Sequence, residues 1–145
     1  MSPAARRRTL VVANRTASTE RLLDEIQRRA AAHPTDFVLL VPSGRRRDWT
    51  LDEALEALRR AARREDRHGI SHVEAIVGQE DPFQAVKAAL SEREFDDVLI
   101  STLSRRTSEW LRRDLPRRVT QLGVPVTVIT EPNQPRLTVE NTMIT

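Results

Sequence analysis

Residues 97–129 decide the fold, and they read DVLISTLSRRTSEWLRRDLPRRVTQLGVPVTVI. The apolar run Val98–Ile100 predicts a buried strand, which is followed by a loop rich in hydroxyl and guanidinium groups. A helical run comes next, and a second buried strand is expected at Val124–Ile129. Short apolar strands that alternate with helices are typical of a parallel sheet covered on both faces. This stretch therefore predicts one βαβ unit of an α/β protein.

The same alternation continues upstream. Apolar runs at Thr9–Ala13, Phe37–Val41 and His72–Val77 predict three further strands, and helical patterns separate them. The run at His72–Val77 alternates with polar residues, which is typical of an edge strand. Right-handed crossovers favour an open, doubly wound sheet. We predict a single-domain, Rossmann-like α/β fold with a five-stranded parallel sheet in the order 3-2-1-4-5 and four helices.

Two helix starts and one helix break can be read directly. Thr50 and Glu53 form a capping box, and Asp81 precedes proline as an N-cap acid, so a helix should begin after each. Pro116 would clash with the carbonyl of residue 112 in an unbroken helix. We therefore expect the last helical run to stop near Trp110 and to restart with Asp114 as its cap. Trp110 is interpreted as a core or interface residue.

Composition bounds the class of protein. The chain has 145 residues, no cysteine, 39% hydrophobic residues and a net charge of +3. Of its 24 basic residues all but Lys87 are arginine, and these interleave with acidic residues, so nucleic-acid binding is not favoured. No apolar run reaches the roughly 20 residues of a membrane span, and a cytoplasmic protein is expected. Residues 1–8 are predicted to be a basic arm, 9–130 the domain, and 131–145 a tail serving as an edge strand or a dimer arm.

A ligand site is expected at the carboxyl edge of the sheet, where strand order reverses. The loop at Asn14 and the loop Ser101–Ser108 border that crevice, and Arg45–Arg47 open on the same edge. Arginine forks bind phosphate or carboxylate with paired hydrogen bonds. We interpret this rim as an anion pocket; the alternative is that these arginines are ordinary solvated loop residues.

Other kinds of site find little support. The four glycines are scattered, so neither a dinucleotide fingerprint nor a P-loop is present. The three histidines lack metal-ligand spacing, and no metal site is expected. Asp96 and Asp97 are interpreted as a solvated turn at the opposite edge of the sheet. Because no base, nucleophile or metal cluster can be named, an enzyme is not expected, although weak ATPase activity is left open.

Three segments resemble the universal stress protein family: IVGQEDP at 76–82, DDVLIS at 96–101 and GVPVTVI at 123–129. The resemblance implies an adenine-nucleotide-binding α/β fold and a homodimer paired through the last strand. The ATP-binding members carry an aspartate after strand one and a glycine-rich motif after strand four. Here Asn14 takes the aspartate's place, Ser101 and Ser104 take the first two glycine positions, and the motif's closing Gly-Ser/Thr pair falls on about Arg113–Asp114.

These observations lead to two functional hypotheses. In the first, a divergent universal stress-type protein with a stress or regulatory role holds ATP, ADP, AMP or another small phosphorylated ligand. Asn14 would bond the base or sugar, and Val41 would line an apolar wall. Ser101 and Ser104 would donate hydrogen bonds to the anion, and Arg105 and Arg106 would neutralise its charge. In the second, the chain is a homodimeric regulatory or interaction module without nucleotide, which pairs through Val124–Ile129 and the tail.

Overall fold

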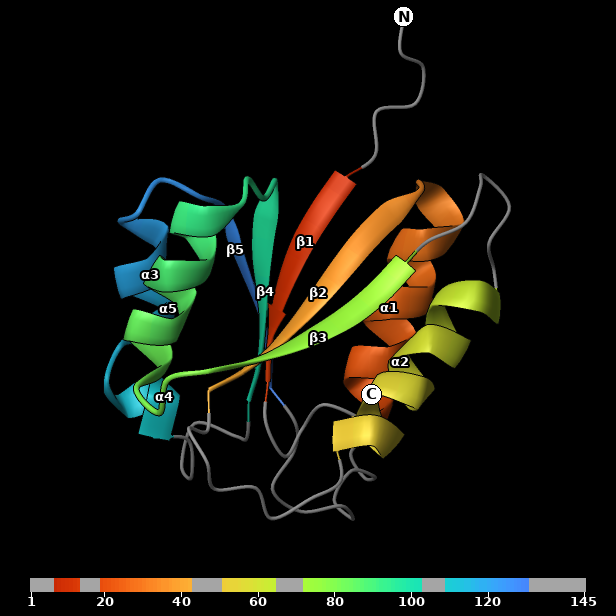
Figure 1. Cartoon of the computed structure of the whole chain (residues 1–145), viewed down its shortest axis with the longest axis horizontal. Helices are drawn as coiled ribbons and strands as arrows, with labels where there is room; N and C mark the ends of the chain where they lie inside the picture. Colours follow the sequence, from red (N-terminus) through yellow and green to blue (C-terminus); the bar gives the residue numbers. More distant parts are fainter. Residues whose placement is uncertain (1–6, 14–18, 43–50, 65–71, 103–108, 131–145) are drawn as a thin grey trace, which may run out of the picture.

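The computed structural model describes residues 7–13, 19–42, 51–64, 72–102 and 109–130 (Figure 1). Within these ranges the strands are β1 (Arg7–Val12), β2 (Thr35–Pro42), β3 (His72–Gly78), β4 (Asp97–Thr102) and β5 (Val126–Thr130). The helices are α1 (Glu20–Ala32), α2 (Leu51–Arg64), α3 (Pro82–Glu92), α4 (Glu109–Arg112) and α5 (Leu115–Thr120).

The strands form one parallel sheet in the order β3-β2-β1-β4-β5, which confirms the predicted fold class. Helices α1 and α2 cover one face, and α3, α4 and α5 cover the other (Figure 1). Four of the five strands start one or two residues away from the predicted residue: β1, β2, β4 and β5. β1 begins at Arg7, inside the segment assigned to the basic arm. β5 begins at Val126, because Pro125 takes part only through its carbonyl oxygen, which accepts a hydrogen bond from the amide of Val98 at 2.9 Å.

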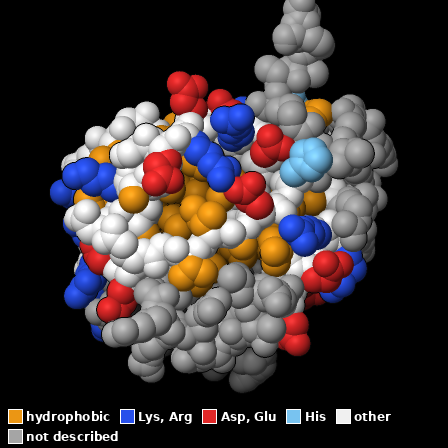
Figure 2. Space-filling view, in the orientation of Figure 1, with side chains coloured by type: hydrophobic (Ala, Val, Ile, Leu, Met, Phe, Trp, Pro, Cys, Tyr) orange, Lys and Arg blue, Asp and Glu red, His pale blue; other side chains and the backbone are white. Residues whose placement is uncertain are grey.

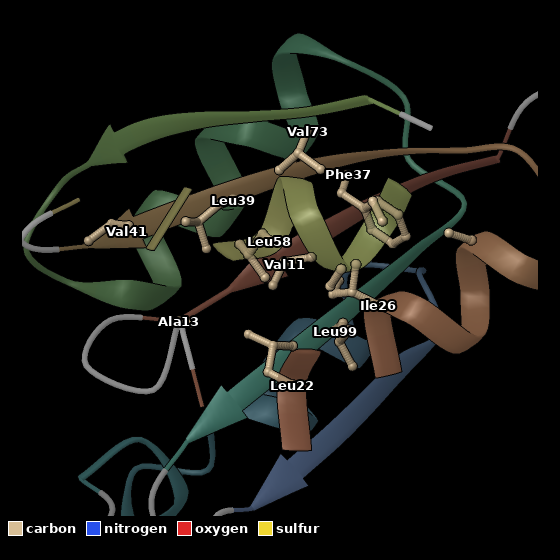
Figure 3. Close-up of a cluster of buried hydrophobic side chains, with 13 residues drawn as sticks. Val11, Ala13, Leu22, Ile26, Phe37, Leu39, Val41, Leu58, Val73 and Leu99 are labelled. Carbon is tan, nitrogen blue, oxygen red and sulfur yellow. The ribbon is translucent and has the colours of Figure 1, made fainter. Parts of the chain in front are cut away.

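Each face of the sheet has its own hydrophobic core, because successive side chains of a strand point to opposite faces. Val11 packs with Leu22, Ile26 and Leu58 beneath α1 and α2, and Figure 3 shows these side chains converging. The second core, beneath α3, α4 and α5, contains Leu10, Val12, Val38, Leu40, Val98, Ile100, Trp110, Leu115 and Val119. The interpretation of Trp110 as a core residue is confirmed.

Local sequence signals place the helix ends. The Asp81 carboxylate accepts a hydrogen bond from the amide of Gln84 at 3.3 Å, as an N-cap acid should. The predicted break at Pro116 is also confirmed, since α4 ends at Arg112 and α5 restarts at Leu115. α2 begins at Leu51, as the capping box predicts, although Thr50 lies outside the described residues. Within the described ranges, no helix is long and apolar enough to cross a membrane.

Asp114 joins α4 to α5 in a left-handed conformation, with φ of 61°, and its side chain forms no capping hydrogen bond. This conformation disfavours most side chains, tolerates aspartate and suits glycine. We expect Asp114→Ala to lower the free energy of unfolding by about 1 kcal/mol, whereas Asp114→Gly should leave it nearly unchanged. Urea denaturation of the two variants measures this difference, and an equal loss in both would contradict the backbone explanation.

Candidate functional site

The strand order reverses between β1 and β4. From β1 the chain proceeds outward to β2 and β3, whereas β4 lies on the other side and is followed by β5. The β1–β4 pairing ends at Val12 and Ile100, which are register partners, so the two strands stop pairing at the same position along the sheet. In doubly wound sheets a ligand binds outside the carboxyl ends of the strands at this reversal. The reversal of strand order therefore lies where the sequence predicted it, and the ligand crevice expected there stays a prediction.

Two of the predicted site residues lie in described parts of the chain. Ser101 is fully buried near the end of β4, and Thr102, the last residue of this strand, is 6% exposed. Val41 is fully buried near the end of β2, within the core beneath α1 and α2. The other four predicted residues are outside the described ranges, as are the further loop arginines: Asn14, Ser104, Arg105, Arg106, Arg15 and Arg45–Arg47.

The structure adds Arg21 to the carboxyl edge. Its side chain extends from the first turn of α1, and Nη1 donates to the carbonyl oxygen of Thr130 at 3.0 Å. Thr130 is the register partner of Thr102, so this guanidinium lies close to the end of β4. The sequence analysis did not find this residue, because helical periodicity places Arg21 on the outer face and its partner is 109 residues away.

A second polar cluster lies at the opposite, amino edge of the sheet. Asp97 is only 7% exposed; its Oδ1 accepts from the hydroxyl of Thr9 at 2.7 Å and its Oδ2 from Nη1 of Arg29 at 2.6 Å. Arg29 also donates to Oε2 of Glu25 at 2.7 Å. We call these four residues the Asp97 network. They tie the last two turns of α1 to the first residues of β1 and β4.

The Asp97 network corrects the prediction of a solvated turn at Asp96–Asp97. β4 begins at Asp97, so this side chain points into the layer between the sheet and α1. Asp96 is exposed as expected and accepts a hydrogen bond from the amide of Arg8 at 2.8 Å. Helical spacing places Arg29 off the apolar stripe of α1, yet its side chain turns inward and forms an ion pair with Asp97.

The Asp97 network makes part of the stability depend on pH. Burial by itself raises the pKa of Glu25, but hydrogen bonds from Arg28 and Arg29 outweigh burial and bring this pKa below its ordinary value. For Arg29, burial lowers the pKa, but hydrogen bonds to Glu25 and Asp97 raise it overall, so this group stays charged. A carboxylate with a depressed pKa in the folded state stabilises the fold above its unfolded pKa, and that contribution disappears as pH falls through the folded value.

We expect the wild type to lose more stability than Glu25→Gln when the pH falls from 5 to 3, because only the wild type must protonate this carboxylate. The ordinary glutamate pKa of about 4.3 marks the upper end of this window. Urea denaturation at several pH values gives the comparison. Parallel pH profiles for the two proteins would contradict the role assigned to Glu25.

The Asp97 network is a structural device, because its carboxylates are occupied by guanidinium and hydroxyl partners. Across the described part of the chain, no three or more histidine, cysteine or acidic side chains are arranged to hold a metal ion.

No model of a known protein family matches this chain, and no curated protein shows significant similarity to it. A functional assignment therefore depends on the chemistry of the crevice itself.

Proposed function

We propose that this protein is a divergent universal stress-type protein that binds an adenine nucleotide or another small phosphorylated ligand in the crevice between β1 and β4. The supporting observation is the reversal of strand order at this point, beside two buried hydroxyl residues that end β4, Ser101 and Thr102. Fold alone does not imply function. The proposal therefore depends equally on the arginines and hydroxyls that the sequence supplies in the adjoining loop, residues 103–108.

The chemistry of this edge suits an anion. Hydroxyl groups donate hydrogen bonds to phosphate oxygens, and arginine adds charge and paired donors. Arg21 already brings one guanidinium to this edge from α1, and Arg105 and Arg106 are proposed to neutralise the ligand. Asn14 is proposed to bond the base or sugar and Val41 to support the apolar side.

The glycine positions of the family's ATP motif are occupied by larger residues here, so the ligand should be held differently. Glycines let backbone amides approach phosphates closely. Asp114, at the Ser/Thr position of the motif's closing pair, adds a negative charge. We therefore expect AMP and ADP, which carry fewer phosphates, to be accommodated more readily than ATP.

Isothermal titration of the wild type with AMP, ADP, ATP and inorganic phosphate tests the proposal. Arg105→Ala with Arg106→Ala should weaken binding about a hundredfold or more, because each lost charge-assisted contact removes roughly 1.5–3 kcal/mol. Ser104→Gly with Arg113→Gly should improve ATP binding. Arg60→Ala, an exposed arginine of α2, provides a control that should leave affinity unchanged. An equal effect of the control, or no binding of any of these ligands, would contradict the proposal.

A second candidate is a homodimeric interaction module that needs no nucleotide. Among the described strands β5 lies at the edge of the sheet, and its Val128 is 37% exposed, so the strand offers an edge and an apolar side chain to a second copy. Under this hypothesis Val128→Lys should convert a dimer to a monomer in sedimentation velocity. Thr127→Lys, on the other face of the same strand, separates loss of apolar contact from added charge alone.

A further inference from the structure

The amino edge carries a groove on the face covered by α3. Two adjoining hollows, of about 640 and 710 Å³, share Arg8, Asp36 and Arg93 in their linings. Pockets of this size are in the range that binds small ligands or short peptide segments. The remaining lining residues belong to β2, β3, the end of α3 and the segments before β4 and β5: Phe37, Val38, His72, Val73, Glu74, Leu90, Glu94, Phe95, Asp96, Leu122 and Val124.

The groove adjoins the last turn of α3 and the residues that follow it, among them Leu90 and Arg93. A Cβ atom at Gly78, the last residue of β3, would lie 2.8 Å from Cβ of Ala85, so the helix comes very close there. At the amino edge, beyond the last turn of α3, Arg93 reaches the sheet through its side chain, with Nη2 at 2.6 Å from Oε2 of Glu74. The sheet between these two points keeps part of its α3 face open.

The net charge of the groove is negative, whereas that of the whole chain is positive. Arg8, Asp36 and Glu74 each stand two residues before a core residue of this face, so their side chains lie on the α3 side of the sheet. Among the described residues, four carboxylates line the groove (Asp36, Glu74, Glu94 and Asp96) against two guanidinium groups, an excess of two negative charges. The chain as a whole has a net charge of +3.

Apolar side chains form the floor between these charges. Val38 is nearly covered, whereas Leu122 is 37% exposed and Leu90 and Phe95 are half-buried. Figure 2 shows hydrophobic side chains gathered in the middle of the face on which α3 and β3 border each other, with acidic and basic side chains around them. An apolar floor with an acidic rim matches a ligand that alternates apolar and cationic groups.

We infer that this groove binds a short basic segment of a partner protein, with arginine or lysine side chains on the acidic rim and an apolar side chain on the floor. Electrostatic complementarity supports this occupant: a cation is attracted to the excess of carboxylates, whereas phosphates and anionic lipid headgroups are repelled. The ion pair between Arg93 and Glu74 is an example, within this groove, of a guanidinium bound by a carboxylate. The groove lies at the edge of the sheet opposite the proposed nucleotide crevice, so the two activities are separable.

The test measures fluorescence anisotropy of a labelled peptide, acetyl-Arg-Leu-Arg-Leu-Arg-amide, titrated with the full chain. Glu94→Gln, at an exposed residue, should raise the dissociation constant several-fold, and addition of Asp36→Asn should bring the loss to about tenfold or more. Glu92→Gln is the matched control: it removes the same charge two residues away, from an exposed position that does not line either hollow. Raising salt from 50 to 500 mM should weaken binding, because screening shortens the reach of the carboxylates.

Three results would overturn the inference. One is equal binding of acetyl-Glu-Leu-Glu-Leu-Glu-amide, which would remove the electrostatic basis. Another is an equal effect of Glu92→Gln and Glu94→Gln. The third is a dimer that Glu94→Gln dissociates in sedimentation velocity, because the occupant would then be a second copy. Nucleotide binding measured on the same variants should be unchanged, so a failure here is distinguishable from a failure of the proposed function.

Discussion

Asp97→Ala is expected to destabilise the fold by about 3 kcal/mol, because truncating one partner of a buried ion pair leaves the other charge uncompensated. Asp97 is 7% exposed and accepts hydrogen bonds from both Thr9 and Arg29. The Arg29 side chain is 17% exposed and keeps Glu25 as a partner after the substitution, which places the estimate at the lower end of the range for buried pairs. Guanidinium denaturation measures the loss directly.

A double-mutant cycle assigns this effect to the Asp97–Arg29 pair. If the two groups act through each other, the double variant with Arg29→Ala should cost clearly less than the sum of the single variants. Asp24→Ala on the exposed side of α1 is the control, and it should change stability by no more than about 0.5 kcal/mol. A loss at Asp97 no larger than at Asp24 would show that the network contributes nothing to the fold.

Gly78→Ala should destabilise the protein by about 1–3 kcal/mol through overpacking. The added Cβ would lie 2.8 Å from Cβ of Ala85 and 2.9 Å from Cδ1 of Leu40. The leucine methyl group can rotate aside, but the Ala85 Cβ is fixed to the helix backbone, so α3 must shift away from β3. Since this contact sets the position of α3, the shift should also alter the amino-edge groove.

Ala85→Gly provides the rescue experiment for Gly78→Ala. Alone it should cost up to about 1 kcal/mol as a glycine in a helix, but in combination it removes the clash, so the double variant should be more stable than additivity predicts. Gly123→Ala is the contrast: its φ is +98° and no atom would contact the added Cβ, so Ala85→Gly should not rescue it. Additive losses in the Gly78–Ala85 pair would contradict the overpacking explanation.

The fold was predictable because its signals are local. Five apolar runs gave the strands, the Asp81–Pro82 pair gave the start of α3, and Pro116 with Asp114 gave the junction between α4 and α5. Each of these depends on neighbours within a few residues. The resulting alternation of strands and helices then limits the sheet to few topologies.

The polar clusters were not predictable in the same way, because their partners are distant in sequence. Asp97 meets Arg29 across 68 residues and Thr9 across 88, and an Asp-Asp pair before a strand is equally typical of a solvated turn. The groove at the amino edge likewise depends on where α3 departs from the sheet. The strand order, and with it the point where that order reverses, was predicted correctly, whereas four of the six predicted site residues lie outside the described residues.

Native mass spectrometry of the purified protein, with and without AMP, ADP and ATP, tests the central proposal most directly. It measures the number of subunits and the mass of any bound ligand in one spectrum. We predict one nucleotide bound per chain at millimolar concentration, with the bound fraction reduced by Arg105→Ala and Arg106→Ala. A protein that stays without ligand at millimolar concentrations of all three nucleotides would contradict the proposed nucleotide site, and a dimer lacking ligand would favour the interaction module.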